Sequence, residues 1–171
     1  LPVGTASSPT PHTEITITPE FAHALDLLDR GSSIFLTGKA GTGKSTLIRH
    51  FLAQTDRNAL TVAPTGIAAL NVDGYTIHRL FSFTRGINEE TVRSGSYYPG
   101  RFAKALRGLD ILIVDEVSMV RADLFDAMVA ALERFGPRPG TPFGGVQLVL
   151  VGDLYQLPPV VQDAESAFIT E

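Results

Sequence analysis

The sequence predicts an α/β fold with a central, mostly parallel sheet flanked by helices. Short apolar runs alternate with amphipathic stretches along most of the chain, as expected when helices connect parallel strands. One such run, Ile34 to Thr37, leads into a glycine-rich turn and an amphipathic helix. Another, Ile111 to Val114, ends in two adjacent acids. At 171 residues and 44% hydrophobic, the chain is long enough for one well-buried domain and too short to assume two.

Composition excludes several kinds of site. The chain has no cysteine, so it has neither disulfides nor thiolate metal ligands. Its four histidines lack the spacing of zinc ligands. No apolar run is as long as a membrane span, and no signal peptide opens the sequence. We therefore expect no membrane partner. We expect a cytoplasmic, nucleoid-associated location in a bacterium, or a nuclear or mitochondrial one in a eukaryote.

The N-terminal end divides into an arm and a helix. Residues 1–13 are rich in Pro, Ser and Thr and show no periodicity, so we expect a flexible arm ahead of one domain at residues 14–171. Thr18 and Pro19 then start a helix, because threonine caps a helix well and proline is tolerated at its first position. Gly31 ends this helix.

The glycine-rich turn GKAGTGKST satisfies the pattern GxxxxGK[ST] between a strand and a helix. Its glycines allow backbone conformations and a close approach that a Cβ would obstruct, so successive N–H groups can converge on phosphate oxygens. The start of the helix adds the positive end of its dipole. We predict a nucleotide-phosphate site made of Gly38, Ala40, Gly41, Thr42, Gly43, Lys44, Ser45 and Thr46.

A second buried strand, Ala59 to Ala63, ends in Pro64 and Thr65. We expect this strand to lie beside the phosphate strand, and its loop to emerge at the carboxyl edge of the sheet, where open α/β folds bind ligands. Thr76 is positioned to cap the helix that follows.

The segment Phe83 to Gly100 has the least pattern, so we expect a loop. It contains Arg85, Arg93 and the pair Tyr97-Tyr98, with Arg101 just beyond. Basic and aromatic residues in a loop can stack bases and hold phosphates, but a solvated surface loop fits equally well. The net charge of −4 argues mildly against broad electrostatic capture of nucleic acid.

The apolar run Ile111 to Val114 delivers Asp115 and Glu116 at its carboxyl end, which is the form of a Walker B site. An amphipathic helix, Asp123 to Phe135, follows. The last buried strand, Val146 to Val151, runs into a loop with Asp153 and Gln156 that two prolines make stiff.

Four blocks together resemble a known family. GKAGTGKST, APTGIAALNVDGYTIHRLF, IVDEVSMV and VGDLYQLPPV occur in the order of helicase motifs I, Ia, II and III of superfamily 1B. They are most similar to those of Pif1-like DNA helicases, with RecD-type helicases next. The resemblance covers roughly Ile15 to Phe168.

The resemblance implies a RecA-like P-loop NTPase domain that binds ATP and Mg²⁺ and drives movement 5′ to 3′ on single-stranded DNA. On this basis Lys44 binds phosphate, while Ser45 and Asp115 hold Mg²⁺. Glu116 orients and deprotonates the attacking water, and Gln156 senses the γ-phosphate.

The same resemblance implies that Pro64, Thr65 and His78 face the DNA. It also implies a second RecA-like domain, with the arginine finger, as a partner in the full-length protein. We therefore expect these residues alone to bind nucleotide weakly and to hydrolyse it poorly. Phe21 stands where the family usually carries a glutamine that reads adenine, so adenine selectivity is unsupported.

Two other interpretations stay open. A small-molecule or nucleotide kinase should have an acceptor pocket and an Arg-rich lid, and no lid pattern is present. A GTPase should carry an NKxD motif, which is absent. The third possibility is a binding module without catalysis. DNA-stimulated hydrolysis by the full-length parent separates the helicase interpretation from both others.

Overall fold

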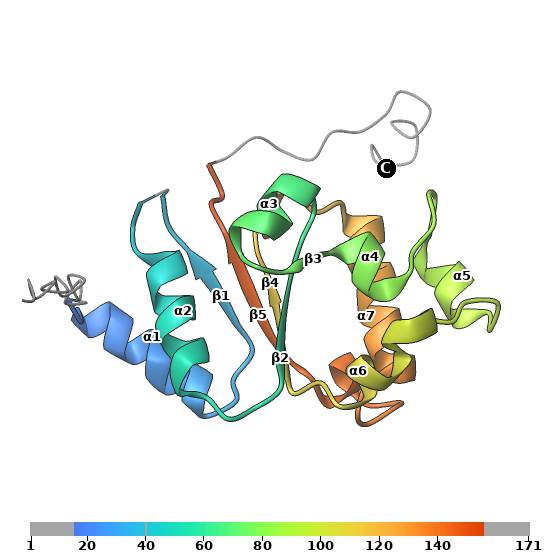
Figure 1. Cartoon of the computed structure of the whole chain (residues 1–171), viewed down its shortest axis with the longest axis horizontal. Coiled ribbons are helices and arrows are strands. Elements are labelled where there is room, and N and C mark those ends of the chain that lie inside the picture. Colours follow the sequence, from blue (N-terminus) through green and yellow to red (C-terminus); the bar gives the residue numbers. More distant parts are fainter. Residues whose placement is uncertain (1–15, 40, 156–171) are drawn as a thin grey trace, which may run out of the picture.

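A computed structural model describes residues 16–39 and 41–155. The predictions for the arm at 1–13, for Ala40 and for Gln156 fall outside these residues. The centre is a sheet in which every neighbouring pair of strands is parallel (Figure 1). Its strands, in chain order, are β1 (Ile34–Thr37), β2 (Ala59–Ala63), β3 (Tyr75–Thr76), β4 (Ile111–Val114) and β5 (Gln147–Gly152). The predicted α/β fold is confirmed.

The spatial order of the strands is β1-β5-β4-β2-β3. The expectation that β2 lies beside the phosphate strand β1 is therefore wrong, because β5 and β4 lie between them. All four side chains of β4 are buried, whereas the burial of β1 alternates. A strand buried on both faces belongs in the middle of a parallel sheet, and a half-exposed one at its edge.

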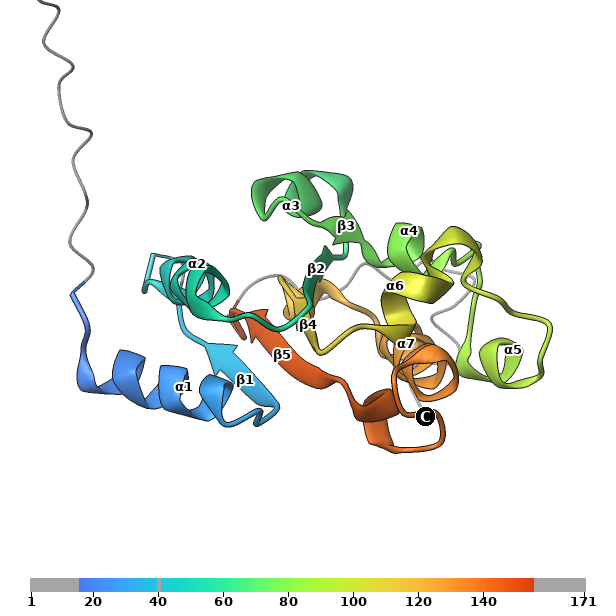
Figure 2. The ribbon, with the colours of Figure 1, turned by 60° about the horizontal axis from the view of Figure 1, so that its bottom comes forward.

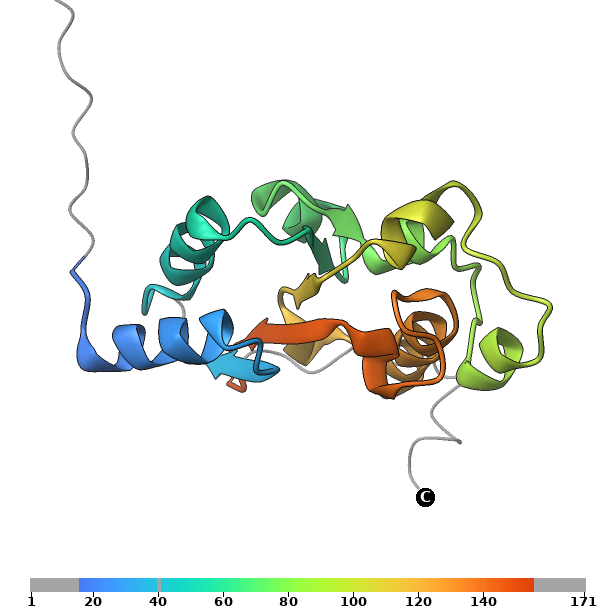
Figure 3. The same ribbon diagram turned by 90° about the horizontal axis from the view of Figure 1, so that it is seen from below.

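Helices cover both faces of the sheet (Figures 2 and 3). The α-helices are α1 (Pro19–Asp29), α2 (Lys44–Gln54), α3 (Gly66–Asn71), α4 (Ile77–Phe81), α5 (Glu89–Arg93), α6 (Ala103–Arg107) and α7 (Ala122–Phe135). Short 3₁₀ turns are η1 (Gly100–Phe102), η2 (Val117–Met119) and η3 (Pro142–Gly145).

The alternation of side chains along β4 separates two apolar clusters. Ile111 and Ile113 pack with α1 and α2, whereas Leu112 and Val114 pack with α4 to α7. This is the two-residue period of a strand buried on both faces. Phe21 belongs to the first cluster and meets the ring of His50 on α2 edge-on, with 6.0 Å between ring centroids. Phe21 thus packs α1 against α2.

The predicted caps are present. The Thr18 hydroxyl accepts a hydrogen bond from the N–H of Phe21 at 3.2 Å, with Pro19 at the start of α1. The Thr76 hydroxyl accepts one from the N–H of Arg79 at 3.1 Å and starts α4. Each cap satisfies one of the N–H groups that the first turn of a helix leaves free.

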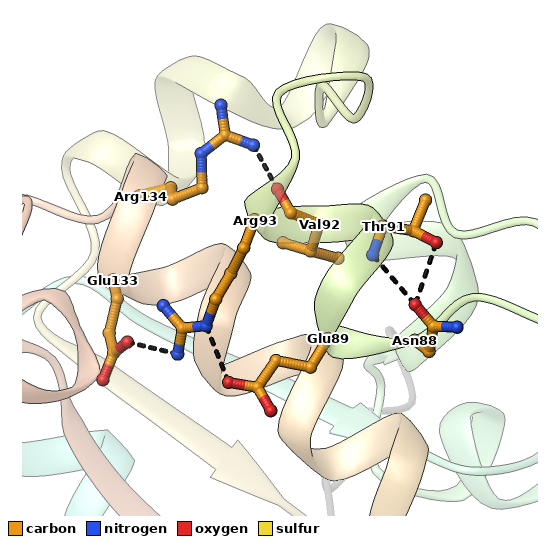
Figure 4. Close-up of polar contacts among 7 residues, drawn as sticks. All are labelled: Asn88, Glu89, Thr91, Val92, Arg93, Glu133 and Arg134. Atoms are coloured by element: carbon orange, nitrogen blue, oxygen red, sulfur yellow. Dashed lines mark hydrogen bonds and ion pairs between the residues drawn. The ribbon is translucent and has the colours of Figure 1, made fainter.

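The expected loop at Phe83 to Gly100 contains helix α5, which is fixed to α7 (Figure 4). The guanidinium of Arg93 bridges Glu89 at 2.6 Å and Glu133 of α7 at 2.8 Å. Arg134 of α7 donates to the carbonyl of Val92. The two contacts with α7 join residues 40 and 42 positions apart, so local sequence pattern gives no sign of them.

Tyr97 lies in the core and cannot stack a base. Only 7% of the residue is exposed, and its hydroxyl donates to the carbonyl of Phe81 at 2.5 Å. Burial raises the pKa of the Tyr97 phenol. The neighbouring Tyr98 is exposed and meets the ring of Phe135 edge-on. The base-stacking interpretation of this pair is therefore wrong for Tyr97.

Candidate nucleotide site

The loop between β1 and α2 leaves N–H groups without side-chain partners. Gly43 caps α2 in a left-handed conformation, with φ 88° and ψ 10°, and no side chain caps the helix. The first N–H groups of α2 are therefore available to an anion. At Gly38, a Cβ would lie 2.8 Å from the hydroxyl oxygen of Thr42. That hydroxyl donates to the carbonyl of Lys39 at 2.7 Å and fixes the turn.

The Lys44 ammonium lies inside this loop. It donates to the carbonyl of Gly38 and, at 2.9 Å, to that of Lys39. An ammonium has three N–H donors, so at least one remains for a ligand. The side chain is half-buried, which strengthens its interaction with any phosphate placed beside it.

The two acids follow β4 directly. The N–H of Asp115 donates to the carbonyl of Val62 at 2.8 Å, which continues the pairing of β4 with β2. Burial raises the pKa of the Asp115 carboxyl, while the N–H of Glu116 and the positive charge of Lys44 act in the opposite direction. Lys44 and Asp115 therefore lie close enough to interact.

Glu116 has φ 49° and ψ 42°, a left-handed conformation that few residues other than glycine adopt. Such a conformation costs about 1 kcal/mol or more and persists where the surroundings impose it, often at functional sites. Here it turns the chain sharply from β4 into η2 and brings Glu116 to the edge of the sheet.

One cavity of about 360 Å³ unites these groups. Its lining residues come from the ends of β1, β4 and β5, which are neighbours in the sheet, so their loops converge. They are Gly41, Gly43, Lys44, Ser45, Thr46, Asp115, Glu116, Gly152 and Asp153. Five of the predicted phosphate residues thus meet the predicted acids, although about 70 positions separate them in sequence. Gly38 and Thr42 are not among the lining residues.

Two residues of this lining had no predicted role. The carboxylate of Asp153 is buried and accepts the N–H of Tyr155 at 2.9 Å. Gly152 allows β5 to approach η2, since a Cβ there would lie 3.0 Å from Cγ1 of Val117. Within the residues that the structure describes, the nearby Ser118 hydroxyl is buried without a hydrogen-bond partner. The sequence feature that could have indicated both residues is the buried strand that runs into Gly152 and Asp153, at the same edge of the sheet as the phosphate loop.

The predicted DNA-side residues lie outside this cavity. Pro64 and Thr65 follow β2, and the Thr65 hydroxyl caps α3 by accepting the N–H of Ala68 at 3.2 Å. His78 is exposed on α4. Because all strands are parallel, the loop after β2 emerges at the same edge as the loops of the cavity. A second cavity of about 630 Å³ adjoins the first and extends between α2 and α3.

The donors fit a magnesium ion. The Ser45 hydroxyl and the Asp115 carboxylate are hard oxygen ligands that line the same cavity. Mg²⁺ in phosphoryl-transfer sites usually takes one or two protein groups, with substrate phosphates and waters as its other ligands. Among residues 16–39 and 41–155, no group of three or more His, Cys, Asp or Glu is placed to hold a metal. Nor does this part of the chain contain a helix long and apolar enough to cross a bilayer.

The sequence of residues 20–171 matches the family model of the PIF1-like helicase. The chain belongs to the PIF1-like helicase family. It is 42% identical over 146 residues to the ATP-dependent DNA helicase PIF1 of Emericella nidulans, covering 78% of this chain and 19% of that protein. It is 38% identical over 157 residues to Pif1 of Bdellovibrio bacteriovorus, covering 89% of this chain and 35% of that protein.

Solved structures of the family agree with the fold. Bacteroides Pif1 in complex with ADP-AlF4 matches at a TM-score of 0.80 and 36% identity, over 92% of this chain and 38% of that one. Bacteroides Pif1 bound to ssDNA matches at a TM-score of 0.79 and the same identity, with the same coverage. The fold is therefore RecA-like. The chain spans between about a fifth and about a third of the length of these curated relatives.

Proposed function

We propose that this chain is the first motor domain of an ATP-dependent DNA helicase. The observation that carries the proposal is the single cavity where Lys44, Ser45, Asp115 and Glu116 meet. A phosphate-binding loop and a pair of acids facing one another are what phosphoryl transfer to water requires. Family membership and the likeness to Pif1 structures with ADP-AlF4 or ssDNA support the same conclusion.

Each residue then has a role. The N–H groups of Gly41 to Thr46 and the ammonium of Lys44 bind the phosphates of ATP. Ser45 and Asp115 hold Mg²⁺, which neutralises charge on the β- and γ-phosphates when bound. Glu116 orients and deprotonates the water. Gln156, outside the described residues, would sense the γ-phosphate, because an amide can bond that group only while it is present.

Single-stranded DNA is the proposed substrate track, with translocation 5′ to 3′. It would cross the carboxyl edge of the sheet at Pro64, Thr65 and His78. Residues 14–171 would form the ATP-binding domain, and a second RecA-like domain of the full-length protein would close the nucleotide site. We propose that the protein acts where its DNA is, at the nucleoid of a bacterium or in the nucleus or mitochondria of a eukaryote.

Steady-state ATP hydrolysis tests the proposal. An arginine finger from a second domain contributes about 10³ to 10⁵ in rate in other phosphoryl-transfer systems, so the 171-residue chain alone should turn over slowly. The full-length parent should show hydrolysis that single-stranded DNA stimulates and Glu116→Gln abolishes. Full motor turnover by the chain alone, or a parent indifferent to DNA, would refute the proposal.

A further inference from the structure

The surface at the β3 edge of the sheet has a charge opposite to that of the whole chain. The net charge is −4, yet the segment 74–109 contains six basic residues and only two acids. The basic residues are Arg79, Arg85, Arg93, Arg101, Lys104 and Arg107. The acids, Glu89 and Glu90, both lie at the start of α5. The excess positive charge therefore lies on α4, η1 and α6.

Two of these arginines lie over aromatic rings. Tyr75 of β3 and Phe102 of η1 pack edge-to-face, with 5.3 Å between ring centroids. The guanidinium carbon of Arg79 lies 5.6 Å from the centroid of the Tyr75 ring. That of Arg101 lies 4.9 Å from the centroid of the Phe102 ring. A ring face attracts a cation placed over it, and this contact uses none of the N–H donors of the guanidinium.

Lys104 and Arg107 extend this row along α6. Both are exposed, and together with Arg101 they recur every three residues, which places them on one side of consecutive helical turns. We call Arg79, Arg101, Lys104 and Arg107 the basic edge. Figures 1 and 2 show α4 and α6, which carry three of its four residues, at the end of the sheet away from α1.

No ion pair neutralises the basic edge in the described residues, although the exposed Asp73 and Asp110 flank the segment 74–109. Across the part of the chain that the structure describes, the ion pairs of Arg30, Arg93 and Arg121 lie elsewhere. None of the four side chains of the basic edge forms an ion pair there. Three guanidinium groups and one ammonium, all on exposed residues, match the chemistry of a phosphate backbone.

We propose that the basic edge binds the phosphate backbone of duplex DNA, the arm of the substrate not yet unwound. The inference rests on the proposed helicase function. A duplex fits better than a single strand because single-strand sites rely on exposed ring faces that stack bases. Here the rings of Tyr75 and Phe102 are half-buried and lie under guanidinium groups. A duplex also offers about one charge per 1.7 Å, twice the density of one strand.

The salt dependence of duplex binding tests this assignment. The 171-residue chain is titrated without nucleotide onto a labelled blunt duplex, and its affinity is followed by fluorescence anisotropy. With four phosphate contacts, affinity should fall about 150-fold between about 50 and 200 mM salt. The double variant Lys104→Gln/Arg107→Gln, which keeps two contacts, should fall only about 12-fold. Arg107→Lys keeps its charge and should behave like the wild type.

A matched control removes a charge elsewhere. Arg30→Gln removes one positive charge at the C-cap of α1, a helix at the opposite end of the molecule from α4 and α6, and should keep the wild-type salt dependence (Figure 1). Circular dichroism confirms that every variant is folded. An unchanged salt dependence in the double variant would overturn the proposal. So would equal losses on the duplex and on a (dT) strand of the same length.

The proposed helicase function is checked separately on the same samples by binding of MgATP. If the wild type does not bind MgATP but binds the duplex with the predicted salt dependence, the proposed motor function is wrong. The basic edge would then remain a DNA-binding surface. Normal nucleotide binding with no duplex binding by the wild type would overturn the basic-edge proposal alone.

Discussion

Replacing Lys44 by alanine should weaken the nucleotide-free fold as well as abolish nucleotide binding. The Lys44 ammonium donates to two carbonyls of its own loop, those of Gly38 and Lys39. A hydrogen bond from a charged donor contributes about 1.5–3 kcal/mol when buried, and much less when exposed. Lys44 is half-buried and one of its two bonds is exposed, so we expect a loss of about 1–2 kcal/mol.

The assay is equilibrium unfolding in urea, with and without Mg²⁺ and a non-hydrolysable ATP analogue. A ligand at about 100 times its Kd should stabilise the wild type by about 2.7 kcal/mol. Lys44→Ala should lose this increment because it lacks the side chain proposed to bind the β- and γ-phosphates. Its nucleotide-free midpoint should already lie below that of the wild type.

Arg85→Ala provides the matched control. It removes another basic side chain, from an exposed position before α5, where the structure shows no ion pair. Its unfolding free energy should stay within about 0.5 kcal/mol of the wild type, with the full ligand increment. The reasoning about Lys44 is refuted if Lys44→Ala unfolds like the wild type and is still stabilised by the analogue.

Three further variants test other parts of the structure. In thermal unfolding, Gly144→Ala should destabilise the protein by more than about 3 kcal/mol, because Gly144 has φ 63° and a Cβ would lie 1.9 Å from the carbonyl oxygen of Leu132. Gly140→Ala is the control: its φ is 82°, but a Cβ there would meet open space, so it should cost only about 1 kcal/mol. Tyr97→Phe should lose about 1 kcal/mol in urea unfolding, because the phenol no longer donates to a buried carbonyl, and an unchanged stability would contradict this bond. Asp115→Asn should stabilise the Mg²⁺-free protein at neutral pH. Burial raises the pKa of Asp115 in the folded state, so the native state binds more protons than the unfolded one above about pH 4, and stability falls as pH rises through that raised pKa. The gain in unfolding free energy from Asp115→Asn should therefore grow as pH rises from about 4 to the raised pKa of Asp115, and then level off. A gain that does not vary with pH would contradict the raised pKa of Asp115.

Sequence predicted the site best where local pattern determines structure. The strand Ile34–Thr37 has its predicted bounds, and α7 begins one residue before its predicted start. The phosphate loop was predictable because its glycines, its lysine and the start of α2 lie within ten residues. The meeting of this loop with Asp115 also followed, since a Walker B acid has meaning only beside a phosphate site.

Long-range packing was not predictable in the same way. The order of strands depends on which apolar runs are buried on both faces, and β2 was misplaced for that reason. Tyr97 is buried because its ring packs against Phe83 and Phe135, the latter on α7. The basic edge went unrecognised because Tyr75 and Phe102, which unite it, lie 27 positions apart.

The most direct test of the central claim is the Mg²⁺ dependence of nucleotide binding by Asp115→Asn, measured by isothermal titration calorimetry. The wild type should bind a non-hydrolysable ATP analogue more tightly with Mg²⁺ than without it, because Ser45 and Asp115 are the proposed ligands of the ion. Asp115→Asn should bind the analogue with nearly the same affinity in both conditions. If Asp115→Asn keeps the full Mg²⁺ dependence of the wild type, Asp115 does not serve the metal and the proposed site is wrong.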